Sequence, residues 1–227
     1  MSTDAPLTTT SYALLGLLGV RPWTTYELTR QMDRSLGRIW PRAQSKLYEE
    51  PKKLVRHGLA RAEKETVGRR PRTVYSITPD GRRALAEWLG HPGAGPVLES
   101  EQLLQVFFAD SGSTSDTLAT LRAARAWAVE RNADNLATAR DYAAGRAAFP
   151  ERAAQTMVVG RFLTEYYRLV ANWADWAGHI VECWPDQPRD AEADPAEMAE
   201  TLRRADWSRT PPDDCEPAPA RPAPGTV

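Results

Sequence analysis

Two short segments of the sequence concentrate side chains of the kind that bind DNA. The first lies between residues 42 and 56, and the second is an arginine-rich tip near residue 70. Guanidinium, amide and hydroxyl groups can hydrogen-bond base edges, and lysine and arginine also bind phosphates. We therefore expect contacts with double-stranded DNA from these side chains: Arg42, Gln44, Ser45, Lys46, Tyr48, Lys52, Lys53, Arg69, Arg70 and Arg72.

The histidines and cysteines do not form a catalytic or metal-binding pattern. His57 stands beside a glycine at a helix end, His91 lies in a linker and His179 lies on the last long helix. The sequence has neither a phosphate-cradling glycine loop nor a nucleophile elbow, so we expect no enzyme, no metal and no cofactor. Cys183 and Cys215 lack the spacing of metal ligands or of a disulfide framework, which is typical of free thiols in a reducing cytoplasm.

The charge is divided between two halves of the chain. The net charge is −1, but the first ninety residues carry 16 Lys and Arg against 9 Asp and Glu, and the remainder carry 13 against 21. A basic half suits a polyanion such as DNA, because its cations release counterions from phosphates. No apolar run approaches the ~20 residues that span a bilayer, so we expect a cytoplasmic protein without a membrane partner.

The elements that must position the DNA-binding side chains are three helices and a hairpin. The hydroxyl residues at 8–11 offer caps for the first helix, Thr24 and Thr25 mark the start of the second, and the third opens at Pro41 and ends at Gly58. Two short strands, residues 59–65 and 72–78, follow, and then a fourth helix runs from Pro79 to Leu89. This order predicts a winged helix-turn-helix with a two-stranded wing over residues 1–90, in which the third helix enters the major groove.

The second half of the chain is predicted to be helical. A linker at 91–96 precedes a helical domain at 97–184, and a Pro-rich acidic tail at 185–227 is predicted to be largely disordered, although residues 195–204 could hold one short helix. Apolar residues recur four and three apart along its long helices, which indicates helix-on-helix packing and predicts a dimer seam. The predicted seam contains Leu118, Leu121, Leu163, Tyr166, Val170, Trp173 and Ile180.

Aromatic side chains on these helices admit two interpretations. Stripes of aromatic residues on long helices are usually packed in a core. The alternative is a pocket for a small effector, with Trp127, Tyr167 and Trp176 as the candidate lining.

Short motifs in the first half resemble the PadR family of transcriptional regulators. They are SYALLGLL at 11–18, TYEL at 25–28, KLY at 46–48, KLVRHGL at 53–59 and TVYSITPDG at 73–81. The later long helices resemble, by pattern alone, the C-terminal dimerisation region of the family's longer branch. The resemblance implies a homodimeric repressor, often relieved by a small and frequently aromatic molecule.

The sequence departs from the family pattern at two positions. Thr25 stands where the family usually has glycine, and Pro51 stands where it usually has leucine in the middle of the third helix. Proline lacks the N–H that a helix interior needs and crowds the preceding turn. We therefore predict a kink or a shortened recognition helix at Pro51.

Other functions remain open at this stage. A regulator of the related MarR type would place a dimer helix before the head, whereas this sequence begins directly with the first helix. A winged-helix interaction protein could instead hold a protein partner through its acidic helices. If the chain is a two-fold dimer that binds DNA, its operator is expected to be an inverted repeat with half-sites about 34 Å apart.

Overall fold

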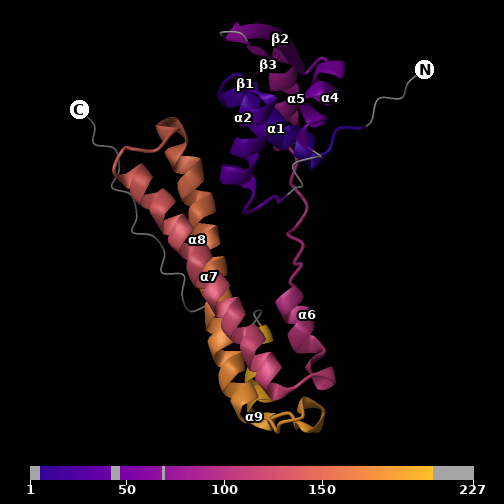
Figure 1. The fold of residues 1–227 in the computed structure, drawn as a ribbon, viewed down its shortest axis with the longest axis vertical. Coiled ribbons are helices and arrows are strands. Elements are labelled where there is room, and N and C mark those ends of the chain that lie inside the picture. The colour runs from indigo at the N-terminus through magenta and orange to yellow at the C-terminus, as the bar shows by residue number, and fades with distance from the viewer. Residues whose placement is uncertain (1–5, 42–46, 68–69, 207–227) are drawn as a thin grey trace. The chain divides into compact units, whose positions relative to one another are not determined.

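The computed structural model describes residues 6–41, 47–67 and 70–206 (Figure 1). The chain forms two compact units that divide after Val97. We call the first the head and the second the helical unit. Helices dominate both units, and the described head adds a small antiparallel sheet, so the predicted mainly helical fold with a winged helix-turn-helix is confirmed.

The helices of the head begin where the sequence provides capping side chains. They are α1 (Thr9–Val20), α2 (Thr25–Gln31), α4 (Glu50–Arg56) and α5 (Pro79–Leu89), and a π-helical turn, η1 (Met32–Leu36), extends α2. Thr8 and Thr24 each close a capping box at the start of α1 and α2, which satisfies amides that the helix itself leaves free. Leu14, Leu28 and Leu54 are fully buried, so α1, α2 and α4 share one core.

The sheet of the head has three strands in the order β1-β3-β2. β2 (Ala60–Val67) and β3 (Arg70–Ile77) form the predicted hairpin, paired from Ala60 opposite Ile77 to Val67 opposite Arg70. Both strands run further toward the tip than the sequence indicated. β1 (Trp23–Thr24) adds to the free edge of β3, and it was not predicted because two residues are too short to show alternation.

Pro51 interrupts the third helical segment, as predicted. Leu47 is helical, Tyr48 and Glu49 form a turn, and α4 begins again at Glu50 with Pro51 in its first turn. The missing N–H costs nothing there, because the first amides of a helix have no partner within it. The Pro51 ring is fully buried, so the break is packed into the core of the head.

The helical unit is built on one long antiparallel pair. It contains α6 (Glu101–Phe107), α7 (Thr114–Ala143), α8 (Ala153–Glu182) and α9 (Pro195–Ala205), with 3-10 turns at Ala109–Ser111, Pro150–Arg152 and Pro188–Asp190. Figure 1 shows α7 and α8 side by side along most of their length, in agreement with their extensive contact. No helix among the described residues is long and apolar enough to cross a membrane.

The stripe predicted as a dimer seam is used inside the chain itself. Leu121 is buried between α7 and α8 with Leu118 and Trp173 packed against its cluster, and Leu163 is buried in a second cluster against which Tyr166 and Val170 pack. Ile180 is half-buried on the same helix. A periodic apolar face demands a partner helix but does not say which chain supplies it, and here α7 and α8 supply it to each other.

The segment after Trp184 has more structure than its composition indicated. α9 lies where the sequence allowed one short helix, and its start is capped by the Asp194 carboxylate, which accepts from the amide of Ala196 at 2.8 Å. The indole N–H of Trp176 donates to the Glu197 carboxylate at 3.1 Å and links α9 to α8. Residues 207–227, the remainder of the predicted disordered tail, lie outside the described residues.

Candidate nucleic-acid interface

We call residues 42–49, which precede α4, the recognition segment; polar contacts to α1 hold the residues on both sides of it. The Trp40 indole donates to the Thr10 hydroxyl at 3.0 Å, just before the segment. At its C-terminal side, the Ser11 hydroxyl donates to Glu50 Oε2 at 2.7 Å. Since Ser11 is fully buried and Glu50 mostly so, these bonds position α4 against α1 in a weakly solvated environment.

Lys53 corrects the sequence-based prediction. Its side chain is only 8% exposed, and its ammonium lies 3.6 Å from Glu50 Oε1, while Ser11 holds the other carboxylate oxygen. Lys53 is buried on α4 together with its neighbour Leu54. Lys53 therefore stabilises the head instead of presenting a charge to phosphate.

Tyr48 and Lys52 do lie at the surface of the head. Tyr48 is 44% exposed, in the turn that precedes α4. The Lys52 ammonium donates to Glu49 Oε1 at 2.8 Å, and this hydrogen bond raises the pKa of Lys52 and lowers that of Glu49. Because both side chains are largely solvated, the pair is weak.

The wing carries Arg72 in a cross-strand pair. Arg72 lies opposite Glu65 in the register of β2 and β3, and its guanidinium donates to Glu65 Oε2 at 2.8 and 3.2 Å. About half of each side chain is exposed. Arg72 therefore reaches solvent from the hairpin, as predicted, but it has a carboxylate partner that the sequence did not reveal.

Several predicted contacts fall outside the described part of the chain. Arg42, Gln44, Ser45, Lys46 and Arg69 lie outside the described residues, and only the backbone of Arg70 is described. The predicted DNA-contacting set is thus placed by the structure at four side chains, of which Tyr48, Lys52 and Arg72 are exposed and Lys53 is not.

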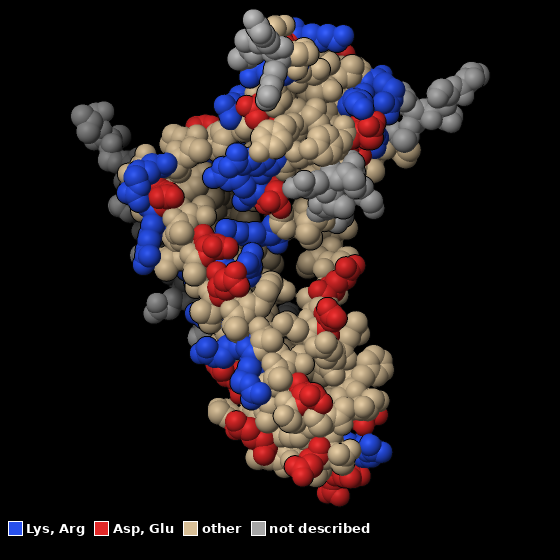
Figure 2. All heavy atoms as spheres, in the orientation of Figure 1, with Lys and Arg blue, Asp and Glu red and all other residues tan. Residues whose placement is uncertain are grey.

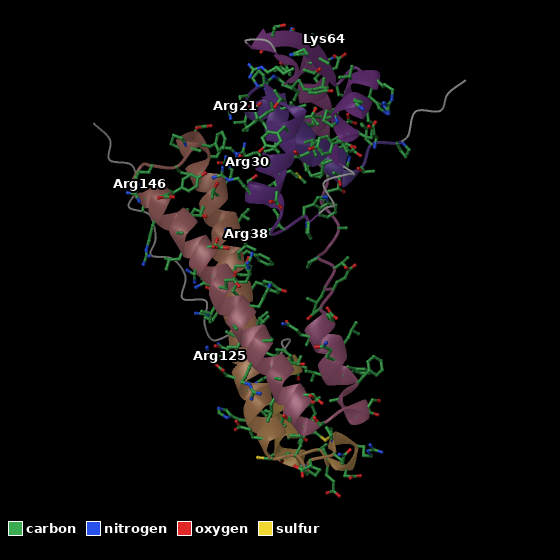
Figure 3. All side chains as sticks on the ribbon, in the orientation of Figure 1. Arg21, Arg30, Arg38, Lys64, Arg125 and Arg146 are labelled. Atoms are coloured by element: carbon green, nitrogen blue, oxygen red, sulfur yellow. The ribbon has the colours of Figure 1, made fainter. Side chains whose placement is uncertain are left out.

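The head also carries arginines that were not among the predicted DNA contacts. The Arg21 guanidinium lies over the Trp23 ring, 3.9 Å from its centroid, at the start of β1. Figure 3 shows Arg21, Arg30 and Arg38 along one side of the head. Arg30, Arg34 and Arg38 are spaced four residues apart, which is a signal that the sequence contained.

Glu27 lies at the start of α2, where Arg21 and Arg72 act on its carboxylate. Its carboxylate accepts from the Thr24 backbone N–H and from the Thr24 hydroxyl, both at 2.8 Å. The backbone hydrogen bond is the main reason why the pKa of Glu27 is lowered, and Arg21 and Arg72 lower it further. The capping box and the arginines thus keep Glu27 ionised.

Two of the three predicted effector-pocket residues come together in the helical unit. Trp127 of α7 meets Tyr167 of α8 edge to face, with ring centroids 5.7 Å apart, and Tyr166 lies 6.2 Å from the same indole. Trp176 is not among the rings of this cluster. Its indole N–H donates a hydrogen bond to Glu197 of α9 instead. Tyr167 is almost fully buried, so the cluster serves at least as core packing.

Large apolar side chains remain exposed on α6 and α8. On α8, Phe162, Leu169 and Trp176 follow one another at seven-residue spacing. On α6, Leu104 and Phe107 are exposed, Phe107 by 78%. Apolar surface of this extent on a folded unit indicates an interaction face.

Each of the two units matches a known protein family. Residues 14–87 match the transcriptional regulator PadR-like family, and residues 99–182 match the family described as virulence activator alpha C-term. The two matches divide the chain within residues 88–98, close to the boundary between the head and the helical unit.

A curated relative of the first family matches part of the chain. The negative transcriptional regulator PadR of Bacillus subtilis is 29% identical over 99 residues, which are 43% of this chain and 54% of that protein. The match thus spans about half the length of the curated relative.

Solved structures share the fold. Bacillus subtilis PadR in complex with operator DNA superposes with a TM-score of 0.69 at 21% identity, over 78% of this chain and 99% of that one. A structure of the same protein in complex with p-coumaric acid gives 0.62 at 20% identity, over 77% and 99%.

Proposed function

Since this chain belongs to the PadR-like family of transcriptional regulators, with a virulence-activator-type domain after its head, we propose that it is a cytoplasmic repressor. It binds double-stranded DNA as a homodimer and is released by a small aromatic molecule. The observation that carries this proposal is the winged-helix head itself, whose sequence has a basic surplus and which exposes Tyr48, Lys52 and Arg72 on or beside the elements that contact DNA in such folds.

The DNA is bound through two kinds of contact. Residues of the recognition segment before the Pro51 break read base edges, with Gln44 as the main candidate. Lys52, Arg69, Arg70 and Arg72 bind phosphates. Two copies related by a two-fold axis bind an inverted repeat with half-sites roughly one helical turn, about 34 Å, apart.

Paired variants separate the two kinds of contact. Arg69→Ala combined with Arg70→Ala is expected to weaken binding to every duplex and to flatten the salt dependence, whereas Gln44→Ala is expected to change sequence preference. Binding is measured by fluorescence anisotropy over a salt series with several duplexes. Equal losses of affinity with unchanged preference in both variants would contradict this division.

The homodimer forms through the exposed apolar faces of α6 and α8. These faces are supported by their exposure and by the heptad spacing of Phe162, Leu169 and Trp176, which suits packing against a helix of a second copy. Leu121 and Leu163 of the predicted seam are buried within one chain, which favours the exposed faces of α6 and α8 as the dimer contact.

Sedimentation of a matched pair of variants tests this face. Leu169 is 65% exposed, and Leu169→Glu is expected to shift the protein to monomers, because a carboxylate would be buried in an apolar interface. Val129→Glu, at a 52% exposed position on α7, should leave the dimer intact. If Leu169→Glu sediments as the unchanged dimer, the two copies meet elsewhere.

An aromatic effector is proposed to act through the cluster of Trp127, Tyr166 and Tyr167. The proposal rests on the edge-to-face rings between α7 and α8 and on the p-coumaric acid complex of the Bacillus subtilis protein. Titration with p-coumaric acid is expected to release bound DNA and to change tryptophan fluorescence in the wild type but much less in Trp127→Leu. Full release by the acid in Trp127→Leu would place the effector at another site.

DNA binding itself is tested by the response to salt. The wild-type protein is expected to bind the DNA upstream of its own gene in preference to random DNA, with log affinity falling by about 0.9 per log unit of salt for each neutralised phosphate. Equal, salt-insensitive binding to both duplexes would remove the regulatory proposal and favour a protein partner instead.

A further inference from the structure

Three arginines line α2, η1 and the turn that follows η1: Arg30 lies on α2, Arg34 on η1 and Arg38 in the turn. They recur every four residues in the sequence, which brings Arg30 and Arg34 to neighbouring helical turns, and Arg38 follows just after the helix end. Arg30 and Arg34 are exposed and Arg38 is half-buried. Figure 3 shows Arg30 and Arg38 on the same side of the head, and Figure 2 shows blue side chains gathered there. We refer to these three residues as the α2 ridge.

The α2 ridge carries uncompensated charge. Within residues 6–41, 47–67 and 70–206, none of its guanidiniums has a carboxylate within ion-pair distance. Other cations of the head do have such partners: Lys52 pairs with Glu49, and Arg72 pairs with Glu65. Lys52 and Arg72, two of the residues predicted to bind phosphate, are therefore partly neutralised within the protein, whereas the ridge has no such partner among the described residues.

Such an arrangement works against the stability of the helix. Like charges four residues apart repel each other along a helix. Elsewhere the chain avoids this repulsion, since Glu165 pairs with both Arg161 and Arg168 on α8. On the ridge, by contrast, Asp33 is adjacent in sequence but forms no ion pair among the described residues.

The backbone under the ridge is also unusual. Residues Met32–Leu36 form a π-helical turn, a rare conformation that occurs frequently at functional sites. It lies between Arg30 and Arg38 and directly precedes the recognition segment. In a helix-turn-helix, the helix before the recognition helix crosses the DNA backbone.

We propose that the α2 ridge is a second phosphate-binding surface, which holds the DNA backbone beside each half-site. This inference rests on the proposed DNA-binding function and adds residues that determine affinity without sequence preference. The ligand is the phosphodiester backbone of duplex DNA, because three guanidiniums at regular spacing suit a linear polyanion.

The test replaces the ridge charge and measures DNA binding over a salt series. In the full-length protein, Arg30→Gln, Arg34→Gln and Arg38→Gln are combined. We expect the salt slope of operator binding to fall by about 2.7 for each protomer, three times 0.9, with an unchanged ranking of duplexes. The corresponding triple lysine variant should retain the wild-type slope, because lysine also binds phosphate as a point charge.

Two controls separate a binding role from a structural one. Arg82→Gln with Arg83→Gln removes exposed charge from α5 and should leave the slope unchanged. The thermal midpoint of the glutamine ridge variant should equal or exceed that of the wild type, since repulsion has been relieved.

The possible failures are distinguishable. A glutamine ridge variant with the wild-type slope overturns the ridge while DNA binding stands. A wild-type protein without salt-dependent DNA binding overturns both the ridge and the proposed function. If the ridge variant changes only the sedimentation of the DNA-free protein at low salt, the ridge contacts an acidic protein surface and the proposal is wrong.

Discussion

Replacing Lys53 by methionine tests how the head positions α4. Lys53→Met keeps the length of the side chain but removes the ammonium that lies 3.6 Å from Glu50. Removing one member of a buried pair typically costs 3–5 kcal/mol. The cost should be smaller here, about 2 kcal/mol, because the separation is long and Ser11 still donates to the Glu50 carboxylate at 2.7 Å.

Amide hydrogen exchange measures this effect locally. A loss of about 2 kcal/mol corresponds to a roughly 30-fold drop in protection of the amides of α1 and α4. The salt slope of DNA binding should not change, because the Lys53 ammonium does not face solvent. A double-mutant cycle of Lys53→Met with Glu50→Gln should give a favourable coupling energy between the two side chains, since they contact each other.

Lys52→Met is the matched control. Lys52 is adjacent in sequence but exposed, so its replacement should leave protection unchanged and lower the salt slope by about 0.9 per protomer. The reasoning is refuted if Lys53→Met keeps full protection and lowers the salt slope as Lys52→Met does. In that case Lys53 would be a phosphate contact after all.

Three further predictions concern the fold of the head. Gly81→Ala should lower stability by about 1–3 kcal/mol in thermal unfolding, because a Cβ there would collide with the backbone oxygen of Leu59; unchanged stability would show that α5 can shift freely. Gly16→Ala, with open space around its Cβ inside α1, should instead raise stability by about 0.5–1 kcal/mol, and a loss would contradict the packing described for α1. The pKa of Glu27 is lowered from 4.5, so its ionised form stabilises the head above that pH, and this contribution is lost as the pH falls through the lowered value. Glu27→Gln should therefore be less stable than wild type at neutral pH and approach it in acid, as followed by thermal midpoints between pH 7 and pH 3; a constant difference would exclude the carboxylate as the cause.

Much of the head could be predicted from local signals. The hydroxyl residues at 8–11 and 24–25, the proline at 51 and the turn signals around the hairpin all act over a few residues, so the sequence alone locates the helices, the break and the strands approximately, and the structure selects Thr8 and Thr24 as the caps. β1 escaped prediction because its only determinant is the edge of β3, about fifty residues away in the chain.

Contacts between distant residues explain the remaining differences. Lys53 looked like a surface cation because its partner Glu50 is held in place by Ser11, which lies thirty-nine residues before Glu50 in the chain. The apolar stripe through Leu121 and Leu163 gave the correct packing face, but periodicity cannot distinguish a helix of the same chain from a helix of a second copy. Tertiary contacts decide both cases, and they become visible only once α1, α4, α7 and α8 are assembled.

Selection of bound duplexes from a random library, followed by footprinting of the enriched sequences, is the most direct test of the account. We predict enrichment of an inverted repeat with half-site centres about ten base pairs apart, protected on one face of the duplex by the wild-type protein. Recovery of sequences without any common motif, bound no better than the starting library, would contradict the claim that the head recognises DNA as a two-fold pair.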